Sequence, residues 1–495
     1  MKDFDDLVND DKYEMGTGQQ LAREEAQATE DMFERRKALR TLAVPTDDAK
    51  VRERLRAMSL PMTLFGERNE DRRNRLKSII ADMQHEAGES TKVESESDSE
   101  EEEEEFYTVG SQDLLHARKW MAEYSMPRAK KRIDKEREDW KTPLKSIIDA
   151  RKRTFEYIKS FSVLGSQVGD SRPISQIKFS PDSRLLATGS WSGSVKLWDI
   201  PNCNHQMTFR GHEGLVGGVA WHPEATLSQS KASVNLASGS QDNTVALWSL
   251  EKDTPLASLK GHTHQVRRVA FHPSGRYVGS ASFDETWRLW DVETQAELLL
   301  QEGHSKEVYT IAFQDDGALV GSAGMDAIGR TWDLRTGRTA MVLDGHADKI
   351  LAMDFSPNGY QCATGSGDGK IIIWDLRALK SISTIPAHNI SVGDVKFYRQ
   401  PEPVLRARSD SQDAKMDESA DTDDTPIVKE PYSHGLFLAS AGFDGYTKLW
   451  SADDWLCQKS IAENSKIMSV DISNDGRHIA TGEWSRSFKL FGTDL

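Results

Sequence analysis

A repeated spacing between a glycine and a tryptophan constrains the fold of this chain more than any other feature of its sequence. In residues 345–375 the dipeptide Gly-His opens a stretch of alternating apolar residues, a turn follows at residues 357–359, and Trp-Asp closes the unit. The same 29-residue interval between glycine and tryptophan recurs in residues 261–291 and 303–333, and the three tryptophans are 42 residues apart. A fixed period of this length is typical of a β-propeller blade.

Counting back from each blade-ending aromatic residue gives seven units of this kind. The second unit exceeds the period by eight residues and the sixth by 34. We therefore predict an all-β, seven-bladed WD40 propeller over residues 157–495, with a disordered insert at about 399–432, after an α-helical and partly disordered N-terminal region. Residues 157–164 precede the first unit as an outer strand would. We expect them to complete the last blade and so remove the open edge of the ring.

Five units keep the histidine together with three partners. In WD repeats this histidine lies within hydrogen-bonding reach of an aspartate six residues before the tryptophan, of a serine or threonine four residues earlier, and of the indole. A buried histidine and aspartate must be satisfied by partners, so we interpret these sets as structural tetrads and not as catalytic triads. Ser192 and Ser485 replace the aspartate in the first and last units. The tetrads are His212, Ser238, Asp242, Trp248; His262, Ser280, Asp284, Trp290; His304, Ser322, Asp326, Trp332; His346, Thr364, Asp368, Trp374; and His388, Ser440, Asp444, Trp450.

Composition narrows the class of protein. The net charge of −16 argues against general binding to nucleic acid, and three cysteines without a Cys-x-x-Cys pair suggest a reduced, intracellular chain. The N-terminus is acidic, unlike a signal peptide, and no apolar run reaches the roughly 20 residues of a membrane span. The glycine-rich residues 365–370 lack the spacing of a phosphate-binding loop. We predict no enzyme, no catalytic residue, no metal, no cofactor and no small-molecule substrate.

Residues 60–80, LPMTLFGERNEDRRNRLKSII, stand apart from the repeats. Before them, Val51, Leu55 and Met58 give a predicted helix one apolar face, and Pro61 ends that helix. Residues 64–66 form an apolar corner before a second, arginine-rich helix. Because two such short helices cannot bury their own surface, they either fold back on the propeller or dock a partner, and we favour docking. We expect a helical and disordered segment at 1–58 and the docking helices at 59–86.

Two charged runs follow. Residues 94–105 are mostly acidic and predict a solvated linker within 87–110. Residues 118–153 hold 13 Lys or Arg against 6 Asp or Glu, within a basic helical segment at 111–156, and Pro127 is expected in the first turn of a helix. A solvated face, a nuclear import signal and a phosphate-contacting helix all fit this stretch, and the acidic run could mask it. The candidate RNA contacts are Lys130, Lys131, Arg132, Lys135, Arg151, Lys152 and Arg153.

The docking segment resembles the splicing factor motif found in the WD-repeat proteins of the U4/U6 small nuclear ribonucleoprotein. The core of that motif reads L-P-x-T-L-F-G-E and is followed by an arginine-rich helix, and the family carries it ahead of a C-terminal seven-bladed propeller. The resemblance therefore extends over nearly the whole chain. The matching residues, which the resemblance implies to be a partner-docking surface, are Leu60, Pro61, Thr63, Leu64, Phe65, Gly66, Glu67, Arg72, Arg75 and Leu76.

The resemblance implies a nuclear, non-enzymatic scaffold of the U4/U6 and U4/U6.U5 particles in pre-mRNA splicing. The implied partners are the U4/U6 RNA duplex, a second splicing protein that clamps this duplex, a nuclear cyclophilin and other proteins of the tri-snRNP, with no membrane. A cullin-RING ubiquitin ligase receptor is the alternative, because residues 332–335 and 374–377 both fit its W-D-x-R pattern. The docking segment has no place in that alternative.

Overall fold

The computed structural model describes residues 48–58, 60–63, 67, 69–89, 110–139, 141, 144–399, 437–452 and 454–493. The chain divides into two compact units, residues 1–104 and 105–495, and each is described by itself. Several predicted features lie outside the described residues. They are residues 1–47 of the expected helical and disordered N-terminal segment, the acidic run at 94–105, the apolar corner Leu64, Phe65 and Gly66, and all of the blade-six insert beyond Arg399.

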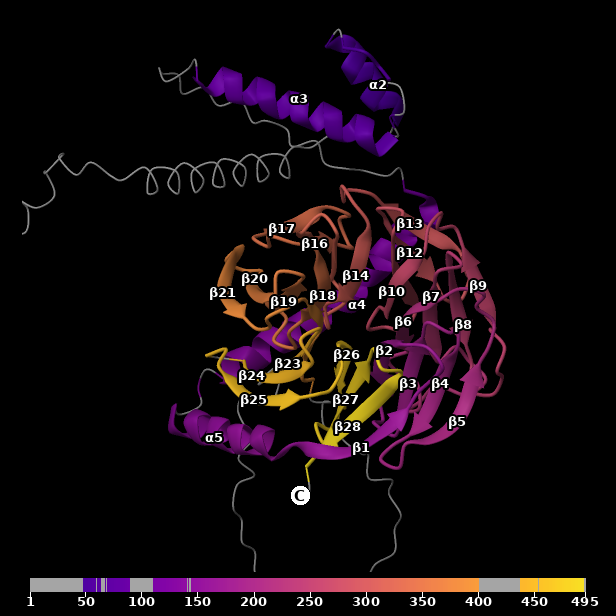
Figure 1. Cartoon of the computed structure of the whole chain (residues 1–495), viewed down its shortest axis with the longest axis vertical. Helices are drawn as coiled ribbons and strands as arrows, with labels where there is room; N and C mark the ends of the chain where they lie inside the picture. Colours follow the sequence, from indigo (N-terminus) through magenta and orange to yellow (C-terminus); the bar gives the residue numbers. More distant parts are fainter. Residues whose placement is uncertain are drawn as a thin grey trace, which may run out of the picture. The chain divides into compact units, whose positions relative to one another are not determined.

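The described part of the first unit is a pair of helices, α2 (Asp48–Ala57) and α3 (Asn69–Glu89) (Figure 1). Asp48 lies in the first turn of α2, where the helix dipole favours an acid. The expected apolar face is present, since Val51 and Leu55 are buried against Leu76 of α3, with Met58 packed beside them. The two helices therefore share one small core, which spans the segment boundary we expected near residue 58.

Seven four-stranded antiparallel sheets form a closed ring in the second unit (Figure 1), which confirms the predicted fold class. From the inner to the outer strand, blade one is β2 (Ile174–Phe179), β3 (Leu185–Ser190), β4 (Val195–Asp199), β5 (Asn204–Phe209); blade two is β6 (Val216–Trp221), β7 (Leu236–Ser240), β8 (Thr244–Trp248), β9 (Ala257–Lys260); blade three is β10 (Val266–Phe271), β11 (Tyr277–Ser282), β12 (Trp287–Asp291), β13 (Glu297–Gln301); blade four is β14 (Val308–Phe313), β15 (Leu319–Gly324), β16 (Ile328–Asp333), β17 (Thr339–Asp344). Blade five is β18 (Ile350–Phe355), β19 (Gln361–Ser366), β20 (Lys370–Asp375), β21 (Lys380–Pro386); blade six is β22 (Val392–Phe397), β23 (Phe437–Gly442), β24 (Tyr446–Ser451), β25 (Cys457–Ala462); and blade seven is β26 (Ile467–Ile472), β27 (His478–Glu483), β28 (Ser487–Gly492) with β1 (Ser162–Val168) outermost.

The position of a strand within its blade decides its burial. The inner strand β14 is buried along its whole length, whereas the outer strand β21 is mostly exposed.

Each inner strand has a register shift after its first residue, as between Val266 and Arg268 of β10. A residue left over by such a bulge is unpaired and points away from the ladder. In β10 this residue is Arg267, at the end of the strand nearest the β11–β12 turn.

The first strand of the ring closes its last blade, as predicted. β1 pairs with β28 in antiparallel register, from Ser162 opposite Gly492 to Val168 opposite Ser487. The predicted bounds of this strand were wrong. Residues 157–160 end a helix, because Ile158 and Phe161, at helical spacing, are buried against blades six and seven, and the strand begins only at Ser162.

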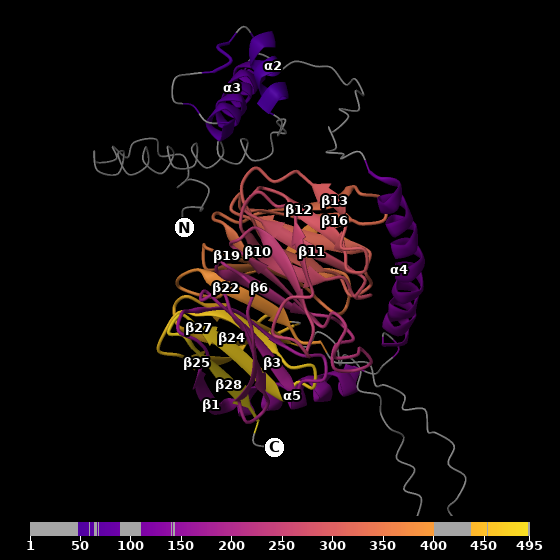
Figure 2. The same cartoon turned by 90° about the vertical axis from the view of Figure 1, so that its right-hand side faces the viewer.

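Two helices precede β1, α4 (Gln112–Asp139) and α5 (Leu144–Ser160), and α4 lies along one side of the propeller (Figure 2). Ser111 caps α4 by accepting a hydrogen bond from the Leu114 amide at 3.2 Å. The expected place of Pro127 was wrong, since it lies inside α4 and not in a first turn. Pro127 is exposed, so water can bond the backbone carbonyl that the missing N–H leaves free.

The antiparallel order of the blades gives the ring two distinct faces. Turns between first and second strands and between third and fourth strands lie on one face, which we call the α4 face because α4 packs there. Turns between second and third strands and the connections between blades lie on the other. We call it the tetrad face, since it carries the histidines and aspartates of the five tetrads.

Candidate functional site

The α2–α3 pair positions the part of the docking motif that the structure describes. Leu60 follows α2 closely, with its amide donating to the Leu55 carbonyl at 3.0 Å, and Pro61 and Thr63 beside it are exposed. Arg75 makes a bidentate pair with Glu67, at 2.6 and 3.0 Å. Such forked pairing fixes geometry as well as charge, so it sets the direction in which the chain enters α3.

The arginines of the motif are less exposed than their sequence suggested. Arg72 is only 4% exposed and contacts Asp48 at the start of α2. Leu76 is fully buried beside Leu55. Arg72 and Leu76 therefore hold the two helices together, whereas Pro61 and Thr63 face solvent.

An apolar stripe on α4 packs against the α4 face of blades three and four. Leu114, Ala117 and Met121 are buried in one cluster with Tyr277 and Leu334. Farther along the helix, Trp120 stacks on Tyr124 with ring centroids 5.3 Å apart, and Tyr124 lies 5.6 Å from the buried ring of His272. Full burial of a large apolar side chain contributes roughly 1.5–3 kcal/mol, so this stripe fixes the helix on the ring.

Several basic residues of α4 belong to the same interface. Arg132 forms an ion pair of 2.8 Å with Asp316 and donates to the Asn358 carbonyl at 3.2 Å. Arg118 lies over Gly337 and Arg132 over Gly359, two turn glycines with φ of 78° and 75°. A Cβ at either glycine would collide with the guanidinium above it, so glycine serves both the turn and the close approach of α4.

The other candidate RNA contacts divide by exposure. Lys130, Lys131, Lys135, Lys152 and Arg153 are exposed, whereas Arg151 is half-buried. Glu136 lies among them on α4 and pairs with Arg377 at 3.1 Å. The structure thus brings Arg132 into the propeller interface and leaves lysines of both helices facing solvent.

Helix α5 attaches to blades six and seven. Its Tyr157 hydroxyl donates to the Gly476 carbonyl at 3.1 Å, and Lys459 of β25 donates to the carbonyl of Lys159 at 2.5 Å. Ile158 and the following Phe161 are fully or almost fully buried. These contacts anchor the chain immediately before the closing strand β1.

The five predicted tetrads share one geometry. In blade three, His262 bonds Asp284 through Nδ1 at 2.7 Å and Ser280 through Nε2 at 2.6 Å, while the Trp290 indole donates to Ser280 at 2.8 Å. Burial alone would raise the pKa of Asp284, but bonds and charge from His262 and the bond from Thr286 lower it to about 2. The equivalent histidine–aspartate and histidine–hydroxyl distances span 2.8–3.3 Å and 2.7–2.9 Å in the sets of His212, His304, His346 and His388.

Burial separates these sets from a hydrolase triad. Ser238, Ser280, Ser322 and Ser440 are each 0% exposed, as is Thr364. Each hydroxyl is also occupied by the indole of its own blade, for example Trp332 on Ser322 at 2.8 Å. A nucleophile must reach its substrate, and these hydroxyls are enclosed, so the arrangement can bind blade strands together but cannot attack a carbonyl.

Blades one and seven replace the tetrad with other polar groups. In blade one, Asp170 takes the place of the histidine and accepts a hydrogen bond from Ser194 at 2.6 Å and pairs with Lys196 at 3.3 Å. In blade seven, Glu463 takes that place and accepts from Thr481 at 3.0 Å. Burial raises the pKa of Glu463 to about 7.

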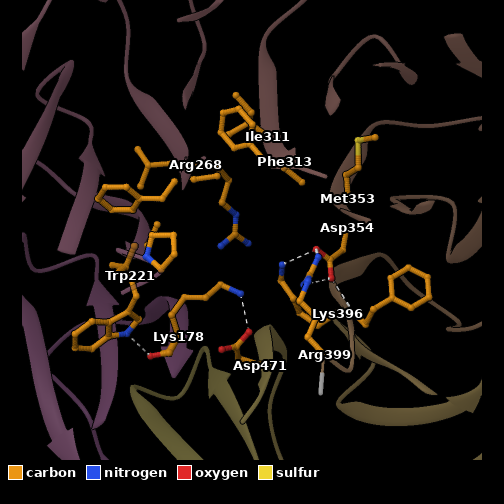
Figure 3. A pocket seen from close by; sticks show the side chains of 18 of the residues that line it. Lys178, Trp221, Arg268, Ile311, Phe313, Met353, Asp354, Lys396, Arg399 and Asp471 are labelled. Carbon is orange, nitrogen blue, oxygen red and sulfur yellow. Dashed lines mark hydrogen bonds and ion pairs between the residues drawn. The ribbon is translucent and has the colours of Figure 1, made fainter. Parts of the chain in front are cut away.

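The central channel holds a ring of charges that our sequence analysis did not single out. A cavity of about 400 Å³ is lined by the inner strands, and Lys178, Arg268, Lys396 and Asp471 project into it (Figure 3). Lys178 pairs with Asp471 at 2.7 Å and Lys396 with Asp354 at 3.1 Å. Arg399 also bonds Asp354, at 3.0 and 3.1 Å. Burial would raise the pKa of Asp354, but Arg399 and Lys396 together lower it.

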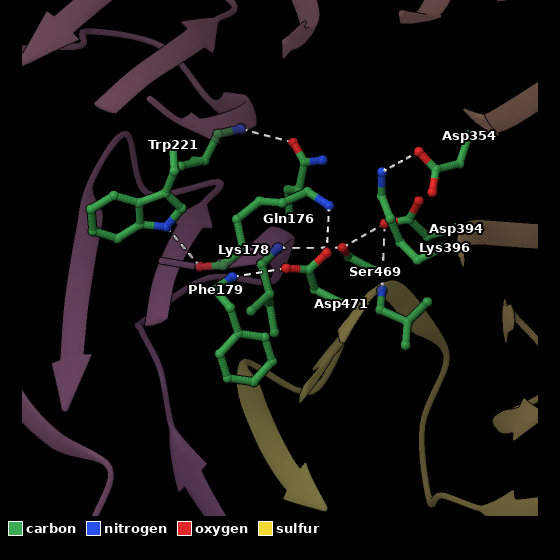
Figure 4. Close-up of polar contacts among 12 residues, drawn as sticks. Gln176, Lys178, Phe179, Trp221, Asp354, Asp394, Lys396, Ser469 and Asp471 are labelled. Atoms are coloured by element: carbon green, nitrogen blue, oxygen red, sulfur yellow. Dashed lines mark hydrogen bonds and ion pairs between the residues drawn. The ribbon is translucent and has the colours of Figure 1, made fainter. Parts of the chain in front are cut away.

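These channel residues also connect neighbouring blades (Figure 4). Asp471 of blade seven accepts from the Phe179 amide of blade one at 2.8 Å, and Gln176 of blade one accepts from the Val219 amide of blade two at 2.8 Å. The Trp221 indole donates back to the Lys178 carbonyl at 2.9 Å. Their signal in the sequence is a polar residue at the third or fifth position of an inner strand whose first and fourth residues are apolar, as in ISQIKF. The channel therefore locks the ring by bonds between blades.

Within the described ranges, no group of three or more His, Cys, Asp or Glu side chains could hold a metal ion. None of the helices that the structure describes is long and apolar enough to cross a membrane.

Comparison with known proteins supports the resemblance seen in the sequence. A family model described as pre-mRNA processing factor 4 (PRP4) like matches residues 51–79. The model of the WD domain, G-beta repeat, matches six stretches, at 161–199, 203–249, 253–291, 296–333, 337–375 and 455–491. The blade without a match over its first strands is blade six, which is present in the structure with residues 400–436 between β22 and β23.

Three relatives illustrate the similarity. The U4/U6 small nuclear ribonucleoprotein Prp4 of Bos taurus is 42% identical over 206 residues, which is 41% of this chain and 40% of the relative. The protein of that name from Homo sapiens is 42% identical over 199 residues, 40% of this chain and 38% of its own. The U4/U6 small nuclear ribonucleoprotein PRP4 of Saccharomyces cerevisiae is 32% identical over 194 residues, 37% of this chain and 40% of its own.

The chain thus spans about two fifths of the length of the curated relatives it matches. The matched PRP4 motif coincides with the α2–α3 pair, and the matched repeats coincide with the blades. In both its motif and its repeats the chain is therefore similar to the Prp4-like WD-repeat proteins.

Proposed function

We propose that this protein is a nuclear, non-enzymatic scaffold of the U4/U6 and U4/U6.U5 particles in pre-mRNA splicing. One observation carries the proposal. A PRP4 motif folded as the α2–α3 pair occurs in the same chain as a seven-bladed propeller, and relatives with 42% identity are named as U4/U6 small nuclear ribonucleoprotein components. The enclosed tetrad hydroxyls support a role in assembly rather than in catalysis.

The docking surface of this scaffold is the segment between α2 and α3, and its partner is a nuclear cyclophilin. Buried Leu55 and Leu76 hold the two flanking helices together, and the Glu67–Arg75 pair orients the segment. We expect the double variant Leu64→Asp, Phe65→Asp to abolish cyclophilin capture without changing the melting temperature of the propeller.

Leu55→Asp is the matched variant for this experiment. It disrupts the helix pair itself and should abolish capture together with the helical signal of that unit. Capture that survives the Leu64→Asp, Phe65→Asp exchange would contradict the docking assignment, and a lower propeller melting temperature would indicate instead that the segment packs on the ring.

The exposed lysines of α4 and α5 are the proposed contacts to the phosphates of the U4/U6 duplex, beside a second protein that clamps it. Lys130, Lys135 and Lys152 remain candidates because they face solvent, whereas Arg132 serves the propeller interface. Phosphate contacts of this kind weaken steeply with salt. Exchange of the three lysines for Gln should therefore reduce RNA recovery most at moderate salt and make the remaining recovery less sensitive to salt. An unchanged recovery would remove these helices from the RNA site.

The decisive test is a pull-down of the tagged full chain from nuclear extract, with the associated RNA probed at moderate and high salt. Recovery of paired U4 and U6 RNAs with other tri-snRNP proteins is the expected result. Absence of both RNAs, with a cullin adaptor in their place, would overturn the proposal.

The geometry of the W-D-x-R segments gives no support to a ubiquitin ligase receptor. Arg335 donates two hydrogen bonds of 3.0 Å to Asp333 of the same W-D-x-R segment. Arg377 pairs with Glu136 of α4, and its guanidinium lies 3.5 Å from the ring centre of Tyr360. Both arginines are thus engaged within this chain, on the face that α4 covers.

A further inference from the structure

The tetrad face carries an aromatic and basic surface at the junction of blades seven and one. Trp191 lies in the β3–β4 turn and Trp484 in the equivalent β27–β28 turn. Their rings meet edge to face, with centroids 4.8 Å apart. Trp484 is 45% exposed, which is unusual for so large an apolar side chain. We call these two residues, with Arg172, Arg267, Lys466 and Arg486, the Trp191–Trp484 patch.

Cations surround the two indoles. Arg267 lies 6.0 Å from the ring centre of Trp191 and 4.9 Å from that of Tyr309, and Lys466 lies 6.0 Å from that of Trp484. The Trp484 amide donates to the Lys466 carbonyl and the Trp191 amide to the Pro173 carbonyl, so exposed Lys466 and Arg172 border the two turns. Arg486, two residues after Trp484, is exposed as well.

The shape of blade two brings Arg267 into the patch. Gly217 takes the unpaired bulge position in β6, where a Cβ would lie 2.7 Å from the Arg267 carbonyl oxygen. Because blade two has no side chain at this position, the guanidinium of blade three can reach across it to Trp191 of blade one. Glycine at position 217 therefore allows the backbone of blade three to pack directly on blade two.

The charge of the patch is not neutralised by the acids of the same turns. Asp170 is paired with Lys196 at 3.3 Å, and Glu483, 3% exposed, is paired with Lys489 at 2.7 Å. Arg267 and Arg268 outweigh the effect of burial and lower the pKa of Tyr309, which indicates a positive potential at this rim. The indole nitrogen of Trp191 has no hydrogen-bond partner among the described residues.

We propose that the Trp191–Trp484 patch binds a short unpaired segment of RNA, a few nucleotides long. An exposed indole face offers a stacking platform to any base, and the four cations offer partners to the phosphates on either side. A base within a duplex is already stacked, so the patch selects single strands and differs from the duplex contacts proposed for α4 and α5. The choice of RNA as the ligand rests on the proposed function.

Fluorescence anisotropy with labelled eight-nucleotide oligouridylate and oligoadenylate, and with a blunt RNA duplex, tests this assignment on the full chain. Trp484→Ala should weaken oligonucleotide binding roughly 5- to 150-fold, since one stacked base is worth that much, and should leave duplex binding unchanged. Trp484→Phe keeps a platform and should retain most of the affinity. The pair Lys466→Gln, Arg486→Gln should flatten the salt dependence of oligonucleotide binding by about 1.4 units of slope.

Tyr446→Ala is the matched control, because Tyr446 is a 40% exposed aromatic residue on the same face of blade six. Equal loss in Tyr446→Ala and Trp484→Ala, or oligonucleotide binding untouched by Trp484→Ala, would overturn the proposal. Binding of an acidic peptide but no oligonucleotide would assign the patch to a protein partner and overturn it too.

The pull-down from nuclear extract separates this proposal from the scaffold function. Recovery of U4 and U6 RNAs by a wild-type chain that binds no oligonucleotide would retain the scaffold and reject the patch. Tryptophan-dependent oligonucleotide binding without recovery of either RNA would support the patch as an RNA site and reject the particle assigned to it.

Discussion

In each of the five blades that carry a tetrad, one hydroxyl bonds both the indole and the histidine. Ser322, for example, accepts from the Trp332 indole and bonds His304, whose other nitrogen bonds Asp326. The group lies at 0% exposure, so water cannot replace a lost partner. Removal of this one oxygen therefore breaks two hydrogen bonds of the tetrad at once.

Ser322→Ala should lower the free energy of unfolding by about 1–3 kcal/mol, because it leaves a buried indole N–H and an imidazole nitrogen unpaired. Urea denaturation followed by circular dichroism measures this change. Thr263→Ala, at an exposed position next to a tetrad histidine, should change stability by less than about 0.5 kcal/mol. Equal effects of the two substitutions would show that the tetrad is not a major source of stability.

His272, under α4, gives the interface a defined response to pH. Burial lowers its pKa to about 4, with a smaller opposing effect from the Gly317 carbonyl and a smaller lowering from Arg128. An unfolded histidine titrates near 6.5. Between these values the unfolded chain binds a proton that the folded chain does not, so this contribution to stability is complete above about pH 6.5 and is lost as pH falls toward 4.

His272→Gln keeps a donor for Gly317 and removes the titration. We expect its free energy of unfolding to fall less than that of the wild type between pH 7 and pH 5, by about 2 kcal/mol. Denaturation at both pH values provides the comparison. Other buried histidines such as His388 remain in the variant. An equal loss of stability in the two proteins would therefore assign the response to those histidines and contradict the role of His272.

At the scale of elements, α4 shows how one helix can combine two roles. Its apolar stripe and Arg132 attach it to blades three to five, and its remaining lysines face solvent. Of the basic residues that suggested RNA binding, Arg132 therefore attaches α4 to the propeller, whereas the exposed lysines are accessible to solvent or a ligand. Burial against the ring, rather than helix propensity, gives such a helix most of its stability.

Met121→Asp should detach α4 from the ring, since Met121 is 0% exposed within the shared cluster, at a cost of several kcal/mol. Hydrogen exchange over residues 112–139 should rise strongly in this variant. Met126→Asp, on the same helix but 60% exposed, is the control and should leave exchange unchanged. Protection that persists in Met121→Asp would contradict the packing of α4.

At the scale of the whole molecule, the propeller depends on residues far apart in the sequence. β1, at residues 162–168, is the outer strand of a blade whose other strands come from residues 467–492. Without it, β28 would present an unpaired edge, which is a template for aggregation. Ring closure thus ties the N-terminal side of the propeller to its C-terminus.

Two truncations isolate this effect. Removal of residues 1–160 leaves β1 in place, whereas removal of residues 1–168 takes it away, and both lack α4 and α5. We expect the longer truncation to melt at least several degrees lower and to aggregate, as measured by light scattering during thermal unfolding. Equal melting and solubility of the two truncations would show that strand closure is dispensable.

The sequence by itself determined the repeat architecture, because a blade is a local unit and its period, alternation and turn residues are all written within about 40 residues. The known WD-repeat pattern together with its spacing was enough to propose all five histidine sets, and the structure places each set within hydrogen-bonding distance. The resemblance in residues 60–76 likewise depended on a contiguous motif, and the family comparison confirmed it.

Only the tertiary structure decided which polar residues serve the ring and which face solvent. Arg72 and Arg132 look like other surface arginines in the sequence, but each has a carboxylate partner more than 20 residues away. Residues 157–160 end a helix because blades six and seven bury Ile158 there. The channel charges and the Trp191–Trp484 patch were missed for the same reason. They combine residues of different blades, and proximity between blades depends on closure of the ring, which no local pattern records.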